Sequence, residues 1–139
     1  MTMPIPESKA MEPLVKVGFR LIQAVEDRKN FGNILLLLES PDGASVRLVD
    51  DRGDHYCDLE FAGLDRWFLV EDVWEAAGLE GLPPSREFGE WVSAMSQLLA
   101  ARWPAIADAF GTSKRRATVE RIDELEKQRT EEIVRGRKG

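Results

Sequence analysis

The chain is poor in the residues that build most catalytic and metal sites. Among 139 residues there is one cysteine, one histidine and one tyrosine, all within the stretch "DDRGDHYC". A single cysteine cannot form a disulfide within the chain, and no Cys/His cluster is present to bind zinc. His55 and Cys57 lie two residues apart on one segment with no orienting acid, so no nucleophile-base-acid pattern is available.

Long hydrophobic runs are absent too. The longest, Ile34 to Leu38, has five residues, far short of the roughly 20 that span a bilayer. The first residues, "MTMPIPESKAMEPL", lack the basic start and apolar run of a signal peptide. The stretch "GLEGLPPS" lacks the lysine of a phosphate-binding loop. Together these absences predict a cytoplasmic protein that is not an enzyme and binds no cofactor, no metal and no membrane.

Charge is unevenly distributed along the chain. The net charge is −6, yet residues 39–90 hold 14 acidic and 4 basic residues, and residues 114–139 hold 9 basic and 6 acidic ones. An acidic body favours a basic partner and disfavours nucleic acid. Negative charge also keeps small proteins soluble, so the same balance is compatible with no partner at all.

The length and composition fit one globular domain. Hydrophobic residues make up 43% of the chain, with four Trp and six Phe, which is enough for a core without disulfides. The sequence predicts a flexible tail at 1–10, a single α+β domain at 11–112 and a charged C-terminal helix at 113–139.

The first predicted element is a helix over 12–28, "EPLVKVGFRLIQAVEDR". Its apolar residues recur at helical spacing, and Pro13 is acceptable in a first helical turn. These apolar residues are Leu14, Val17, Leu21, Ile22 and Val25.

A three-stranded antiparallel β-meander is predicted next. The run Ile34–Leu38 suits a central strand with both faces covered, and Ser40-Pro41-Asp42-Gly43 is a turn. The segments around 46–48 and 55–61 alternate as strands with one buried face, which places His55 on the face of Cys57. Residues 51–54 then form the hairpin connection. The Arg-Gly-Asp tripeptide there matches integrin ligands only by coincidence, and the acids lack the spacing of a calcium loop.

The C-terminal half is predicted to be helical and to pack on one sheet face. A short helix covers 68–79, and Ser85 caps a longer helix that runs toward Gly111. Pro104 either kinks this helix or begins a new one at Trp103. The helix over 113–139 has a thin apolar stripe, so it adds little to the core and packs loosely on the body or on a partner.

The predicted binding surface lies on the outward side of the third strand and its turn. A tyrosine among carboxylates on a rigid strand suits a basic protein partner, although an ordinary solvent-facing strand has the same pattern. The candidate partner-binding residues are Asp50, Asp51, Asp54, Tyr56, Asp58 and Glu60.

A second interpretation concerns the basic C-terminal helix. Two small basic clusters, 114–116 and 135–138, would allow contact with nucleic acid, although they are interleaved with acids and contain no aromatics. The macrodipole explains the last cluster without any ligand. The same helix could instead make the chain a homo-oligomer.

The run "FGNILLLLES", followed by "VRLVDDRG" and "WFLVEDV", resembles small uncharacterised bacterial proteins of the immunity type, which neutralise a toxin made by the same cell or its kin. The resemblance covers about residues 31–74. It implies an acidic one-domain α+β inhibitor that blocks its target by charge and shape, and it implies no catalytic residues.

Overall fold

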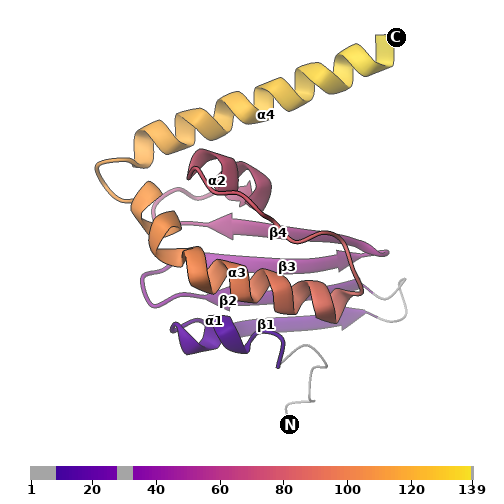
Figure 1. Cartoon of the computed structure of the whole chain (residues 1–139), viewed down its shortest axis with the longest axis vertical. Coiled ribbons are helices and arrows are strands. Elements are labelled where there is room, and N and C mark those ends of the chain that lie inside the picture. The colour runs from indigo at the N-terminus through magenta and orange to yellow at the C-terminus, as the bar shows by residue number, and fades with distance from the viewer. Residues whose placement is uncertain (1–8, 28–32, 139) are drawn as a thin grey trace.

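The computed structural model describes residues 9–27 and 33–138 and has an α+β architecture (Figure 1). Five antiparallel strands form one sheet in chain order: β1 (Arg20–Asp27), β2 (Asn33–Glu39), β3 (Ser45–Asp51), β4 (Asp54–Glu60) and β5 (Trp67–Leu69). The helices are α1 (Glu12–Lys16), α2 (Val70–Ala76), α3 (Phe88–Ala109) and α4 (Arg115–Lys138). The predicted class is therefore confirmed, and the predicted three-stranded meander is the centre of a larger sheet.

The helix predicted over 12–28 is wrong beyond Lys16. Gly18 adopts a φ of +106°, which ends the helical path, and a Cβ there would lie 2.9 Å from Pro41 Cγ. The following residues form β1, in which Leu21 pairs with Leu38 and Val25 with Leu35. Pairing with β2 supplies long-range hydrogen bonds that local helical spacing does not reveal.

The connection between β3 and β4 is the predicted hairpin turn. Arg52 has a φ of +56° and Gly53 a φ of +90°, as two-residue hairpin turns require. The Gly53 N–H donates to Asp50 Oδ1 at 3.0 Å. Asp51 and Asp54 pair across the end of the hairpin, and both are exposed.

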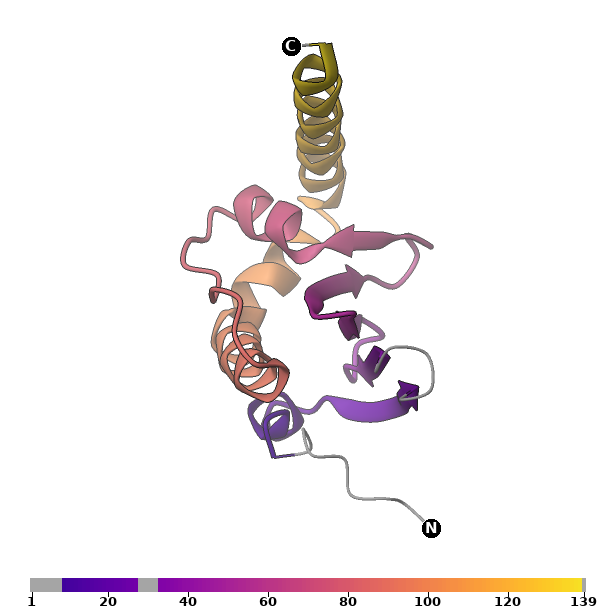
Figure 2. The same cartoon turned by 90° about the vertical axis from the view of Figure 1, so that its right-hand side faces the viewer.

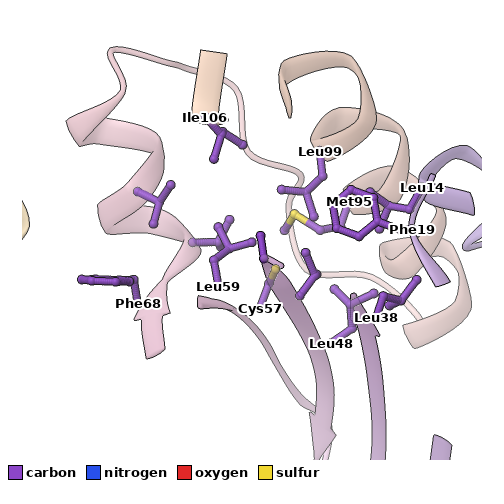
Figure 3. Packing of buried hydrophobic residues seen from close by; sticks show 14 of the residues in the cluster. Leu14, Phe19, Leu38, Leu48, Cys57, Leu59, Phe68, Met95, Leu99 and Ile106 are labelled. Atoms are coloured by element: carbon purple, nitrogen blue, oxygen red, sulfur yellow. The ribbon is translucent and has the colours of Figure 1, made fainter. Parts of the chain in front are cut away.

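The two faces of the sheet differ in what covers them. Figure 2 shows the sheet from its edge, with α1 and α3 against one side. We call that side the inner face and the opposite side the outer face; among the described residues, no helix covers the outer face. The core fills the inner side, where sheet residues meet residues of α1 and α3 (Figure 3). Its labelled members are Leu14, Phe19, Leu38, Leu48, Cys57, Leu59, Phe68, Met95, Leu99 and Ile106.

The long helix α3 differs from its prediction at its start, and its middle decides between the two alternatives for Pro104. The cap is Glu87, whose carboxylate accepts from the N–H groups of Gly89 and Glu90, so the prediction of Ser85 as cap is wrong. The helix continues through Pro104, so no new helix begins at Trp103.

The C-terminal helix α4 packs mainly on α2 at the β5 end of the body (Figure 1). Ile122 is fully buried and Leu125 is 8% exposed, so the expectation that this helix adds little to the core is wrong for these two residues. Arg129 pairs with the buried Asp72 of α2. From Thr130 to Arg135 every residue is exposed, which agrees with the thin stripe.

Candidate binding surface

The outer face carries an apolar row that crosses four strands. Residues paired directly across neighbouring strands point to the same side of a sheet. The register pairs Val25 with Leu35, Leu35 with Val49, and Val49 with Tyr56. Val25 is 44% exposed and Tyr56 42%, while Leu35 and Val49 are half-buried. We call these four residues the apolar row.

A second outer row runs beside the apolar row and ends at β5. It joins Leu37, Arg47, Asp58 and Leu69 by direct pairing. Arg47 donates through Nη2 and Nε to Asp58 Oδ2 at 2.6 and 3.1 Å. The Arg47 guanidinium also lies 4.3 Å from the centre of the Trp67 ring. This stacking and the two hydrogen bonds hold the side chains of Arg47 and Asp58 in place.

Three of the six predicted binding residues lie together at the hairpin end of the outer face, and a fourth lies on the same face at the other end of β4. Tyr56 belongs to the apolar row, and Asp51 and Asp54 flank the exposed turn beside it. Glu60 lies further along the same side of β4, in the row of Trp67, and is half-buried. These side chains add negative charge to one aromatic and aliphatic surface.

The other two predicted residues have different surroundings. The side chain of Asp58 is 12% exposed and its charge is compensated by Arg47, so the expectation of an open carboxylate there is wrong. Asp50 pairs with His55 in the inner-face row, and its Oδ1 lies 3.7 Å from His55 Nε2. The acidic surface is therefore smaller than the sequence predicted.

His55 and Cys57 lie on the inner face, as parity along β4 predicted. The His55 side chain is 7% exposed and packs against Phe88 and Trp91, at 5.2–5.3 Å between ring centres. Its Nδ1 is buried and has no hydrogen-bond partner among the described residues. Burial raises the pKa of the Cys57 thiol well above its usual value, and the nearby charges of Asp58 and Glu71 raise it further. A thiol of this kind is a poor nucleophile.

The first basic cluster of the C-terminal helix is occupied by contacts within the chain. Lys114 pairs with Asp108 at 2.6 Å, and Arg116 pairs with Glu120 at 3.2 Å. Arg115 donates to the backbone carbonyls of Phe110 and Ala62. Of the second cluster, Arg135 is exposed, and the side chains of Arg137 and Lys138 lie outside the described set. The side chains of Lys114 and Arg116 nevertheless stay 60% and 93% exposed, so their contacts are surface ion pairs of small energetic weight.

The search for metal-binding clusters covers the described residues. No group of three or more His, Cys, Asp or Glu side chains among them could hold a metal ion. A hollow whose lining includes Asp42, Phe61, Phe110 and Arg115 has a volume of about 60 Å³, well below that of a typical ligand pocket. None of the helices in the described ranges is both long and apolar enough to cross a bilayer.

Comparisons with protein-family models, with curated proteins and with solved structures found no match for this chain.

Sequence reasoning missed much of the outer face. The run Ile34–Leu38 was expected to be covered on both faces, yet Leu35 and Leu37 are half-buried on the uncovered side. Trp67 and Val25 were assigned to a connector and a helix, so neither was placed on the sheet. One signal was available: "WFL" is an aromatic and aliphatic triplet of the kind that short strands favour.

Proposed function

We propose that this chain is a non-enzymatic protein-binding protein that holds a basic partner on the outer face of its sheet. The specific role we propose is inhibition of that partner, as in immunity-type proteins. The apolar row carries this proposal. Four aligned apolar side chains cross the outer face of the sheet, which no described helix covers, and apolar surface of this kind, rimmed by polar residues, marks protein-interaction sites.

The surroundings of the apolar row support a protein partner. Aromatic residues and arginine are enriched where protein interfaces are most buried, and Tyr56, Trp67 and Arg47 supply both. Arg47 is already held by Asp58 and stacked on Trp67, so little side-chain entropy is lost when a partner covers it. The surface is in this sense ordered before binding.

The sign of the charge supports a basic partner. Asp51 and Asp54 are exposed at one end of the apolar row, and Glu60 lies on the same face. Carboxylates at the rim of an interface attract a cationic partner and speed the encounter. A rigid acidic face that covers a basic active surface would inhibit by occlusion, with no chemistry of its own.

Site-specific photo-crosslinking tests this proposal in the cells that make the protein. A photoreactive phenylalanine analogue at position 49 or 56 lies in the apolar row, and the same residue at position 97 lies on the exposed side of α3. We expect one basic protein to be linked from positions 49 and 56 and not from 97. The protein identified in the crosslinked adduct, once purified on its own, should lose its activity when the wild-type chain is added. Links from position 97 alone, or no protein linked from the outer face, would refute the proposal.

A further inference from the structure

The apolar row is only one residue wide on two of its four strands. Residues two positions apart along a strand lie on the same side of the sheet. On β3 and β4, every neighbour of the row on the outer face is therefore charged. These neighbours are Arg47, Asp51, Asp54 and Asp58. The apolar surface there is a narrow line across the strands, whereas a partner sheet packs through a broad apolar face.

The spacing along the row matches the turns of an α-helix. Neighbouring strands lie about 4.8 Å apart, so the row spans about 14 Å from Val25 to Tyr56. Helix residues i, i+3, i+7 and i+10 form one stripe, which spans about 15 Å. An extended strand repeats its same-face residues about every 6.6 Å, so it has only three positions over that length.

The twist of the sheet turns in the same sense as this helical stripe. Adjacent strands are rotated by about −20 to −25°, so the three steps of the row rotate its side chains by about −60 to −75° in total. Ten helix residues turn through about 1,000°, which is about 80° short of three full turns. Both rotations are left-handed about the line of the row. A helix laid along the row therefore keeps one stripe directed toward all four side chains.

The charge beside the row lies mainly on one flank. Asp51 and Asp54 are exposed on the hairpin side. Residues 50–54 include three acidic side chains and one basic one, which leaves this flank negative. On the opposite flank, Arg47 Nη2 donates to Asp58 Oδ2 at 2.6 Å, so that pair adds little net charge. The hairpin flank therefore favours lysine or arginine, and the net charge of −6 opposes a second copy of this chain as the occupant.

We propose that the partner presents an amphipathic α-helix that lies across β1 to β4 along the apolar row, with basic residues on its flank nearest the hairpin. Its apolar residues at i, i+3, i+7 and i+10 contact the four residues of the row in strand order. This inference rests on the proposed function, because it names the part of the partner that the outer face holds. Apolar anchors at helical spacing are a common mode of peptide recognition.

Crosslink mapping from each position of the row tests the inference. The photoreactive phenylalanine analogue is placed in turn at positions 25, 35, 49 and 56 of the full chain, with position 97 as the control, and mass spectrometry identifies the linked residues of the partner. Val25 and Tyr56 are 44% and 42% exposed, so replacing these two should leave the fold intact.

A helix along the row predicts a particular order of linked residues. Those linked from positions 25 and 56 should lie in one segment, about ten residues apart, with the residues linked from 35 and 49 between them. At least one lysine or arginine should lie within one helical turn of the residue linked from position 56, because Asp54 lies beside Tyr56 on β4.

The other outcomes separate this inference from the proposed function. Linked residues only about four positions apart would indicate an extended segment, and linked residues in separate segments would indicate a sheet. Either result overturns the helix but leaves a protein partner on the outer face. A linked helix without the basic residue, or an adduct of two copies of this chain, overturns the inference as well. No protein linked from any of the four positions would refute the inference and the proposed function together.

Discussion

At the scale of single residues, the two most distinctive side chains serve the core. Cys57 and His55 face α3 rather than solvent, because parity along β4 sends alternate residues to opposite sides. The sequence located both on the same face correctly. It could not show that Phe88 and Trp91 would pack on His55, because those contacts join segments more than 30 positions apart.

The raised pKa of the Cys57 thiol makes a prediction about alkaline stability. A group whose pKa is higher when folded contributes stability below its unfolded pKa, and that contribution is lost as the pH rises toward the folded pKa. We expect the free energy of unfolding to fall from about pH 8.5 upward, with Cys57 contributing up to ~1.4 kcal/mol per pH unit. Cys57→Ala should remove this component. Urea titrations from neutral to alkaline pH measure it, and identical slopes for both proteins would contradict it.

The ion pair between Arg129 and Asp72 allows a second prediction at the scale of residues, about the stability that it contributes. The Asp72 side chain is 4% exposed, and its Oδ2 has no hydrogen-bond partner among the described residues, so the carboxylate depends on Arg129. Arg129→Ala should cost about 2–4 kcal/mol because it leaves a buried charge uncompensated. Adding Asp72→Asn should recover part of that loss.

Arg121 offers the matched control for Arg129. It also pairs from α4 to α2, with Glu75 at 3.5 Å, but both side chains are exposed. Arg121→Ala should therefore cost less than about 1 kcal/mol. Chemical denaturation of Arg129→Ala, of Arg129→Ala with Asp72→Asn, and of Arg121→Ala measures these free energies of unfolding. Equal losses of stability for Arg121→Ala and Arg129→Ala would show that the burial of Asp72 is unimportant.

At the scale of elements, the sequence predicted those whose signals are local. The turn at 52–53 and the helix α4 follow from residues that are neighbours in sequence. The segment 20–27 was misassigned because Leu21, Ile22 and Val25 fit a helical spacing as well as a strand with a bulge. Its partner β2 decides the structure, and pairing between distant segments is not visible in local spacing.

The two ends of α4 should contribute unequally to stability. Ile122 is fully buried, whereas residues 130–135 are exposed. Ile122→Ala should cost about 2–5 kcal/mol, as large-to-small changes in a core do. A chain that ends at Thr130 should unfold within about 0.5 kcal/mol of wild type, because the residues removed include no described buried side chain. A large loss of unfolding free energy in the truncated chain would show that residues 131–139 make stabilising contacts with the body.

At the scale of the whole molecule, the fold separates two surfaces. The inner face is consumed by the core, and the outer face combines the apolar row with Arg47, Trp67 and the acidic turn. The sequence predicted the side of Tyr56, Asp58 and Glu60 from alternation. It could not predict that Arg47 compensates Asp58, since the pairing register of β3 with β4 sets that contact.

The acidic end of this surface predicts a salt-dependent encounter. Association with a basic partner should slow as salt rises, because the Debye length falls from about 10 Å at 0.1 M to about 3 Å at 1 M. Asp51→Lys with Asp54→Lys should slow association further and change dissociation little. Stopped-flow or surface-plasmon measurements at several ionic strengths give both rates. An association rate that neither salt nor the charge reversal alters would place the interface elsewhere.

The proposed binding of the partner by the apolar row is tested most directly by the affinity of the chain for that partner. Tyr56→Ala removes the exposed aromatic side chain at one end of the row, and Gln97→Ala makes a change on the exposed side of α3. With the partner captured by crosslinking, titration calorimetry should give a dissociation constant at least tenfold higher for Tyr56→Ala, through faster dissociation. Gln97→Ala should bind like wild type. Unchanged affinity for a folded Tyr56→Ala, or a loss confined to Gln97→Ala, would contradict the account.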